Sequence, residues 1–111
     1  MAARRLGMVI RVREDRVGDY RALHADDHPG VRDLLCAAGI RNFSIFIDRL
    51  PDGALYLFGY YEYHGSDYEA DMARLDTEPR NREWIAMTAP MQIPFPGQAG
   101  WKIMEEVYHN S

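Results

Sequence analysis

The segment NFSIFIDRLPDGALYLFGYYEY, residues 42–63, decides the fold. It contains two runs rich in β-branched and aromatic residues, 42–48 and 55–63, which are typical of strands. Between them, Leu50-Pro51-Asp52-Gly53 supplies the proline, aspartate and glycine that tight turns favour. The segment therefore predicts a β-hairpin of two antiparallel strands.

Strand patterns also lie near both ends of the chain. Residues 6–13 place apolar side chains at every second position, and residues 101–109 alternate in a similar way. A period of two residues is the signature of a strand with one buried face. We therefore expect a first strand at 6–13 and a last one at 101–109.

Two helical regions separate these strands. Between residues 17 and 38, apolar side chains recur at three- and four-residue steps, as on a helix that faces a core. Pro29 disfavours helical dihedrals in the residue before it, so we expect one helical piece that ends within 24–27 and another over 29–38. We expect the second helical piece to end at Gly39.

The second helical region follows the hairpin. Ser66 is the predicted N-cap of a helix that carries Tyr68, Met72 and Leu75. Further helical turns around Trp84 follow Pro79, and a proline-rich stretch then predicts an irregular loop.

The resulting order, β-α-β-β-α-β, predicts a single ferredoxin-like α+β domain over residues 1–111. Its four-stranded antiparallel sheet would carry both helical layers on one face. The other face would be too apolar for water, so we expect a ligand cleft there or a second copy, as in a homodimeric α/β-barrel. The side chains expected on that face are Tyr56, Phe58, Tyr60, Trp101 and Ile103.

Composition excludes several classes of function. Thirteen basic and seventeen acidic residues give a net charge of −4, which argues against nucleic acid as a partner. Arg11 and Arg13 interrupt the first apolar stretch, so we expect no export or membrane segment and a cytoplasmic protein. A single cysteine, Cys36, fits a small buried side chain in a reducing compartment.

Tyr20 and His24 are the first candidates for chemistry. These two residues are four apart on the first helix, so their side chains lie on one face and could bind one ligand together. Histidine both gives and takes a proton near neutral pH, so the pair suits acid/base work. The alternative is a packed aromatic ring beside a hydrogen-bonded histidine.

His24 and His28 are also four residues apart, which resembles a helical pair of metal ligands. Pro29 should distort the geometry at His28 and no third ligand has an evident position, so we expect no metal. Trp84 could offer a flat platform to the apolar face of a sugar, or could anchor the following loop to the core. The chain contains none of the common nucleotide-binding, redox or serine-hydrolase motifs.

Several short motifs, taken in order, resemble the L-rhamnose mutarotase family over nearly the whole chain. They are Tyr20-Arg21-Ala22-Leu23-His24, His28-Pro29, AGIRNFSIF at 38–46, Arg82-Glu83-Trp84, and MEEVYH at 104–109.

The resemblance implies a cofactor-free, cytoplasmic homodimer of ferredoxin-like subunits that interconverts the α and β anomers of L-rhamnose. It implies that His24 is the catalytic acid and Tyr20 a substrate-binding residue. A second sugar-binding tyrosine falls on Phe43, which lacks the hydroxyl, and a pair of stacking tryptophans is reduced to Trp84.

We therefore expect a mutarotase for L-rhamnose or a related 6-deoxyhexose, with His24 as general acid/base. Tyr20, Phe43 and Trp84 would contact the sugar. The alternative is a small-ligand binding module, or a cofactor-free monooxygenase-like protein with the same dimeric α/β-barrel.

Overall fold

The computed structural model describes residues 3–111. Its strands are β1 (Arg4–Val12), β2 (Ile40–Arg49), β3 (Leu55–Tyr63), β4 (Gln92–Ile93) and β5 (Lys102–Met104). Its helices are α1 (Val17–Leu23), α2 (Arg32–Ala37), α3 (Tyr68–Thr77) and α4 (Pro79–Thr88), with 3₁₀ turns at Glu14–Arg16 and Ala89–Met91.

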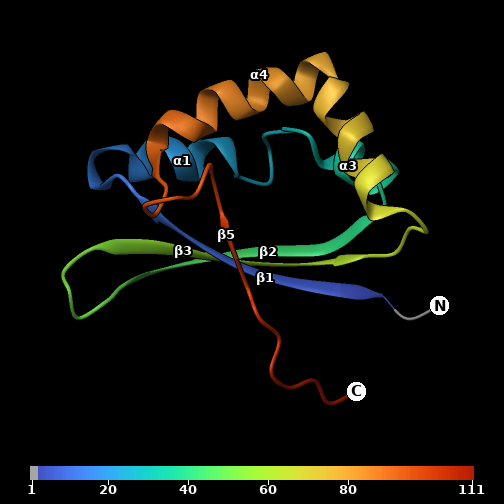
Figure 1. Ribbon diagram of the computed structural model, residues 1–111. Helices are drawn as coiled ribbons and strands as arrows, with labels where there is room; N and C mark the ends of the chain where they lie inside the picture. Colours follow the sequence, from blue (N-terminus) through green and yellow to red (C-terminus); the bar gives the residue numbers. More distant parts are fainter. Residues whose placement is uncertain (1–2) are drawn as a thin grey trace.

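The strands form one antiparallel sheet in the order β2-β3-β1-β4, and β5 pairs with β1 as well. The helices gather on one face of this sheet, above it in Figure 1. This arrangement confirms the predicted ferredoxin-like α+β fold. Within residues 3–111, no helix has the length and apolar character needed to cross a membrane.

The predicted hairpin is present. β2 and β3 pair from Ile40↔Tyr63 to Arg49↔Leu55, and the turn between them is closed by a hydrogen bond from the Gly53 amide to the Leu50 carbonyl, at 2.8 Å. Gly53 has a φ of +85°, in the left-handed region that glycine tolerates best. The turn residues therefore act as the sequence predicts.

The core lies between the sheet and the helices. Every second residue of β1 is buried, and the alternate residues of β3 are buried beside them. The fully buried side chains at its centre are Ile10 and Leu57.

The last predicted strand was too long. β5 covers only Lys102–Met104, which pair with Gly7–Val9, and residues 105–109 form no strand. β4 pairs with the Arg11–Val12 end of the same strand edge. Met8 pairs with Ile103, so Ile103 lies on the helix-covered face with Met8, contrary to our expectation of the open face. Trp101 also lies on that face, where its indole approaches Gly59.

Two smaller predictions were also wrong. The N-cap of α3 is Asp67, whose carboxylate accepts a hydrogen bond from the Ala70 amide, and not Ser66. Cys36 is exposed, because the short helix α2 turns its neighbour Leu35 toward the core instead.

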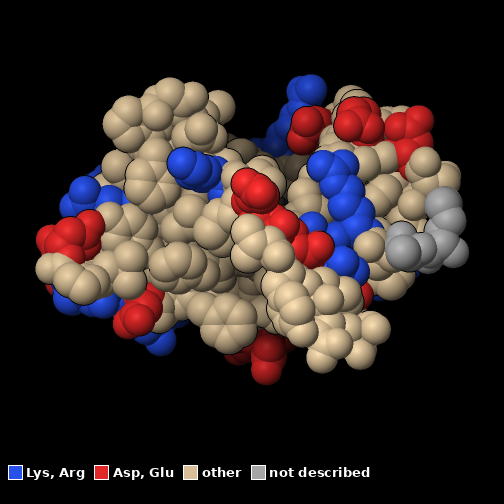
Figure 2. Space-filling view, turned by 60° about the horizontal axis from the view of Figure 1, so that its bottom comes forward, with Lys and Arg blue, Asp and Glu red and all other residues tan. Residues whose placement is uncertain are grey.

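The face of the sheet away from the helices is apolar at its centre. Tyr56 and Phe58 of β3 point to this face, and Phe46 of β2, paired with Phe58, is 65% exposed. Figure 2 shows the molecule from the side that includes this face, and most of the visible surface is neither acidic nor basic.

Candidate active site

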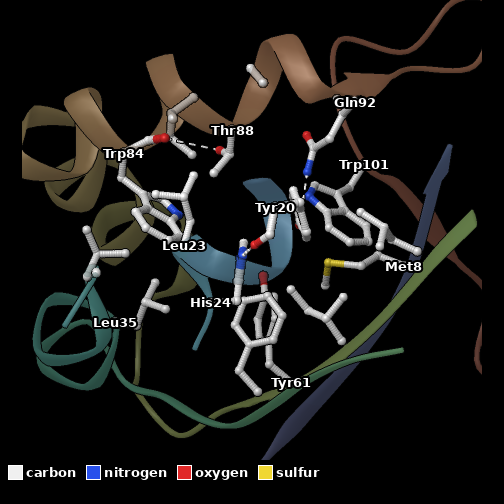
Figure 3. A pocket seen from close by; sticks show the side chains of 18 of the residues that line it. Met8, Tyr20, Leu23, His24, Leu35, Tyr61, Trp84, Thr88, Gln92 and Trp101 are labelled. Carbon is white, nitrogen blue, oxygen red and sulfur yellow. Dashed lines mark hydrogen bonds between the residues drawn. The ribbon is translucent and has the colours of Figure 1, made fainter. Parts of the chain in front are cut away.

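A cavity of about 930 Å³ lies between the helices and the sheet. All four predicted site residues line it: Tyr20, His24, Phe43 and Trp84. They come from α1, the residue after it, β2 and α4, so the fold brings together side chains from across the sequence. Figure 3 shows Tyr20 and His24 in the middle of the cavity, with Trp84 to one side.

His24 follows the last residue of α1, and its ring stacks on Tyr20. The two ring centroids are 4.3 Å apart at an interplanar angle of 25°. The Nδ1 atom of His24 lies 2.7 Å from the backbone carbonyl of Tyr20. A carbonyl oxygen can only accept, so Nδ1 carries the hydrogen, and in the neutral ring Nε2 holds the lone pair.

Electrostatics favour this neutral form. Burial lowers the pKa of His24, and the positive charge of Arg32 and the nearby His28 act in the same direction. The hydrogen bond to the Tyr20 carbonyl opposes the shift without reversing it. At neutral pH, His24 is therefore a proton acceptor through Nε2.

Tyr20 presents a hydroxyl that is ready to donate. Its side chain is buried, and its oxygen accepts a hydrogen bond of 3.3 Å from the Nε2 amide of Gln92. That bond leaves the hydroxyl hydrogen free, since no acceptor within residues 3–111 binds it. Burial raises the pKa of Tyr20, so the hydroxyl keeps its proton.

The loop after α1 is held by one arginine. The Arg32 guanidinium donates hydrogen bonds of 3.0 to 3.1 Å to the carbonyls of His24, Ala25 and Asp26. Because α1 ends at Leu23, His24 and His28 do not stand on one helix, and the geometry of a helical metal pair is not formed. Across residues 3–111, no three His, Cys, Asp or Glu side chains cluster as a metal site would need.

Trp84 closes one side of the cavity. Its ring centroid lies 5.1 Å from that of His24, edge to face, and 5.9 Å from that of His28. Gly30, with a φ of +55°, lies against its ring, because a Cβ there would be at van der Waals distance, 3.4 Å, from the indole. The indole therefore lies directly beside the candidate acid/base group.

A β-bulge aims Phe43 into the cavity. The pairing of β2 with β3 shifts between Arg41 and Ser44, and Asn42 adopts a φ of +54°. The extra residue turns Phe43 to the inner face, where its ring lies 5.2 Å from that of Tyr61. Without the bulge, the alternation of the strand would direct Phe43 to the open face.

Gln92 and Trp101 are among the residues of this cavity that sequence reasoning did not identify as site residues. Gln92 sits in a proline-rich stretch that offers no periodic signal. For Trp101 a signal existed, because a glycine within an aromatic strand, Gly59, often marks a site where another group approaches closely.

Comparisons with known proteins agree with this geometry. A family model described as L-rhamnose mutarotase matches residues 5–110. The chain belongs to the L-rhamnose mutarotase family. The predicted resemblance, and with it the prediction of a mutarotase-like isomerase, is confirmed at the level of the family.

Individual members of the family are distant in sequence. An L-rhamnose mutarotase of Ligilactobacillus salivarius is 28% identical over 109 residues, 95% of each chain. One of Bacillus subtilis is 30% identical over 89 residues, covering 80% of this chain and 81% of its own.

Two solved structures share the fold. The crystal structure of an L-rhamnose mutarotase from Formosa agariphila matches with a TM-score of 0.72 at 21% identity, over 97% of this chain and 99% of its own. A protein described as a putative antibiotic biosynthesis monooxygenase from Nitrosomonas europaea matches at 0.52 and 13% identity, over 100% of this chain and 98% of its own. The second likeness extends to the fold alone, so it does not favour the monooxygenase-like alternative.

Proposed function

We propose that this protein interconverts the α and β anomers of L-rhamnose or a closely related 6-deoxyhexose. One observation carries the proposal: the bond from Nδ1 of His24 to the Tyr20 carbonyl leaves Nε2 as a proton acceptor in a cavity of this family's fold. The Tyr20 hydroxyl, with its free proton, stands in the same cavity.

Ring opening needs one proton removed and one supplied. Nε2 of His24 takes the proton of the anomeric hydroxyl, the bond between the anomeric carbon and the ring oxygen breaks, and an aldehyde forms. The electron pair of the broken bond goes to the ring oxygen, which takes the Tyr20 proton. The aldehyde then rotates about its bond to the neighbouring carbon.

Ring closure reverses these transfers. The ring oxygen attacks the opposite face of the aldehyde and returns its proton to Tyr20, while His24 returns its proton to the new anomeric hydroxyl. Both residues regain their starting states, and the sequence uses no electron acceptor. Positioned acid/base groups of this kind contribute roughly 10²- to 10⁴-fold in rate.

Trp84 and Phe43 would bind the sugar without taking part in proton transfer. The indole beside His24 offers a flat apolar surface to the C–H face of a pyranose. Phe43 adds an apolar contact where the family resemblance implies a tyrosine, so one hydrogen bond to a sugar hydroxyl is lost. We expect this difference to alter which sugar oxygens are recognised.

We also infer that the protein is a homodimer built on the open face of the sheet. Phe46 is 65% exposed at the centre of that face, beside the aromatic side chains of β3. A contiguous aromatic surface of this kind is stabilised when a second copy covers it. The cytoplasm stays our predicted compartment, because the exposed thiol of Cys36 suits reducing surroundings.

Exchange NMR tests the proposed activity. Saturation of one anomeric proton of L-rhamnose should be transferred to the other anomer faster when the protein is added. A panel of other deoxysugars then ranks the substrates. No acceleration on any of these sugars would refute the proposed function.

A further inference from the structure

The segment from β4 to β5 builds one wall of the cavity. Gln92 and Trp101 come from this segment, and Figure 3 shows them on the side opposite Trp84, with Tyr20 and His24 between. The amide of Gln92 binds the Tyr20 hydroxyl, so this wall is in direct contact with the candidate proton donor. A ligand that reaches Tyr20 therefore meets this wall as well.

The position of Trp101 is fixed by the sheet beneath it. A Cβ placed on Gly59 would lie 3.4 Å from the indole, which is an ordinary van der Waals distance, so the ring packs against the sheet at this position. Trp101 packs against both groups of core residues, including the group that contains Tyr20, and still lines the cavity. Trp101 is therefore a packed residue of the cavity wall and not a surface residue.

The surroundings of Trp101 are apolar. Met8 and Leu57 line the cavity from the strands below it, and Ile103 follows it on β5. None of these three side chains carries a hydrogen-bond donor. The indole itself has one donor, the Nε1–H at the edge of the ring, whereas the face of the ring has none. A hydroxyl group held against this face and these three side chains would give up its water without gaining a partner, whereas a methyl group would gain contact area.

The chemistry of a 6-deoxypyranose places its methyl group near this wall. The methyl carbon is bonded to C5, and C5 is bonded to the ring oxygen that takes the proton of Tyr20 in the proposed reaction. The methyl group therefore lies next to the atom at which Tyr20 acts. The wall that holds the Tyr20 hydroxyl in place is the one that carries Trp101.

We propose that Trp101 is a specificity-determining residue that holds the C6 methyl group of the substrate and disfavours sugars with a hydroxyl at C6. This proposal rests on the proposed mutarotase function and adds to it the selection of 6-deoxy sugars. An apolar pocket discriminates against an added hydroxyl by on the order of 10²-fold.

A pair of sugars tests this role. L-rhamnose and L-mannose differ only in the C6 hydroxyl, so the ratio of their kcat/KM values in anomer exchange reports on the wall around C6. The wild-type ratio should favour L-rhamnose by roughly 10- to 100-fold. Trp101→His replaces the large apolar face with a small ring that has two hydrogen-bonding nitrogens, so it should lower the ratio about tenfold or more, and Trp101→Phe should largely keep it.

Ile93→Gln is the matched control. Ile93 lies on the same segment, is exposed and does not line the cavity, so this variant should keep the wild-type ratio. An unchanged ratio in Trp101→His would overturn the proposal.

The proposal would also be overturned if Trp101→His lost kcat/KM equally on both sugars and melted at a lower temperature, since these results indicate a structural role. Wild-type protein that leaves the anomer exchange of L-rhamnose unaccelerated would instead refute the mutarotase function itself.

Discussion

Gly59→Ala tests the packing of Met8 over the sheet, beside Trp101. The added Cβ would lie 2.9 Å from Cγ of Met8, 3.3 Å from its sulfur and 3.4 Å from the Trp101 indole. The first distance is too short for two carbon atoms, so Met8 or the strands must shift. Overpacking of this kind typically costs about 1–3 kcal/mol in the free energy of unfolding.

This cost converts into a melting temperature that calorimetry can measure. For a domain of this size, 1 kcal/mol corresponds to a shift of roughly 4 °C. We therefore expect Gly59→Ala to melt about 4–12 °C below the wild type. Met8→Ala removes the atoms that clash, so in the double variant the effect of Gly59→Ala should be smaller by at least about 0.5 kcal/mol.

Gly18→Ala provides the control. Gly18 lies in α1, and within the described chain nothing lies within 4 Å of a Cβ placed there. Alanine favours the helix by up to about 1 kcal/mol, so this variant should be at least as stable as the wild type. A Gly59→Ala protein that melts at the same temperature as the wild type would show that Met8 does not pack over Gly59 as described.

Three further predictions concern the site and the assembly. Because burial lowers the pKa of His24 from its usual 6.5, the rate of exchange should stay on its plateau as pH falls through 6.5 and drop only below it; an inflection above 6.5 would contradict the assigned base. Trp84→Ala should raise KM more than it lowers kcat while the melting temperature holds, and a joint loss with a lower melting temperature would make Trp84 a loop anchor. Wild-type protein should be a dimer by light scattering at micromolar concentration and Phe46→Asp a monomer; a monomeric wild type would exclude the dimer.

The sequence predicted best those features that depend on local spacing. The period of two in β1 reports directly which side chains are buried, and Leu6 to Val12 follow it. The four-residue step from Tyr20 to His24 likewise fixes their stacking, although α1 ends before His24. The family motifs add the prediction that this pair belongs to an active site.

Features set by long-range pairing could not be predicted in the same way. Trp101 was placed on the wrong face because β5 is short and its register with β1 is set by tertiary contacts. The orientation of Phe43 depends on a bulge at Asn42 that a two-residue period does not indicate. Gln92 reaches Tyr20 across 72 positions of sequence, a contact that only the folded chain creates.

The central claim is that Nε2 of His24 moves the proton in anomer exchange. Its most direct test is exchange NMR on L-rhamnose with His24→Gln, which keeps a polar side chain but removes the base. His64→Gln is the control, because His64 binds Glu62 outside the cavity. We predict that His24→Gln lowers the catalysed rate by about 10²- to 10⁴-fold at an unchanged melting temperature, while His64→Gln keeps the wild-type rate. A stably folded His24→Gln protein that exchanges the anomers at the wild-type rate would contradict the claim.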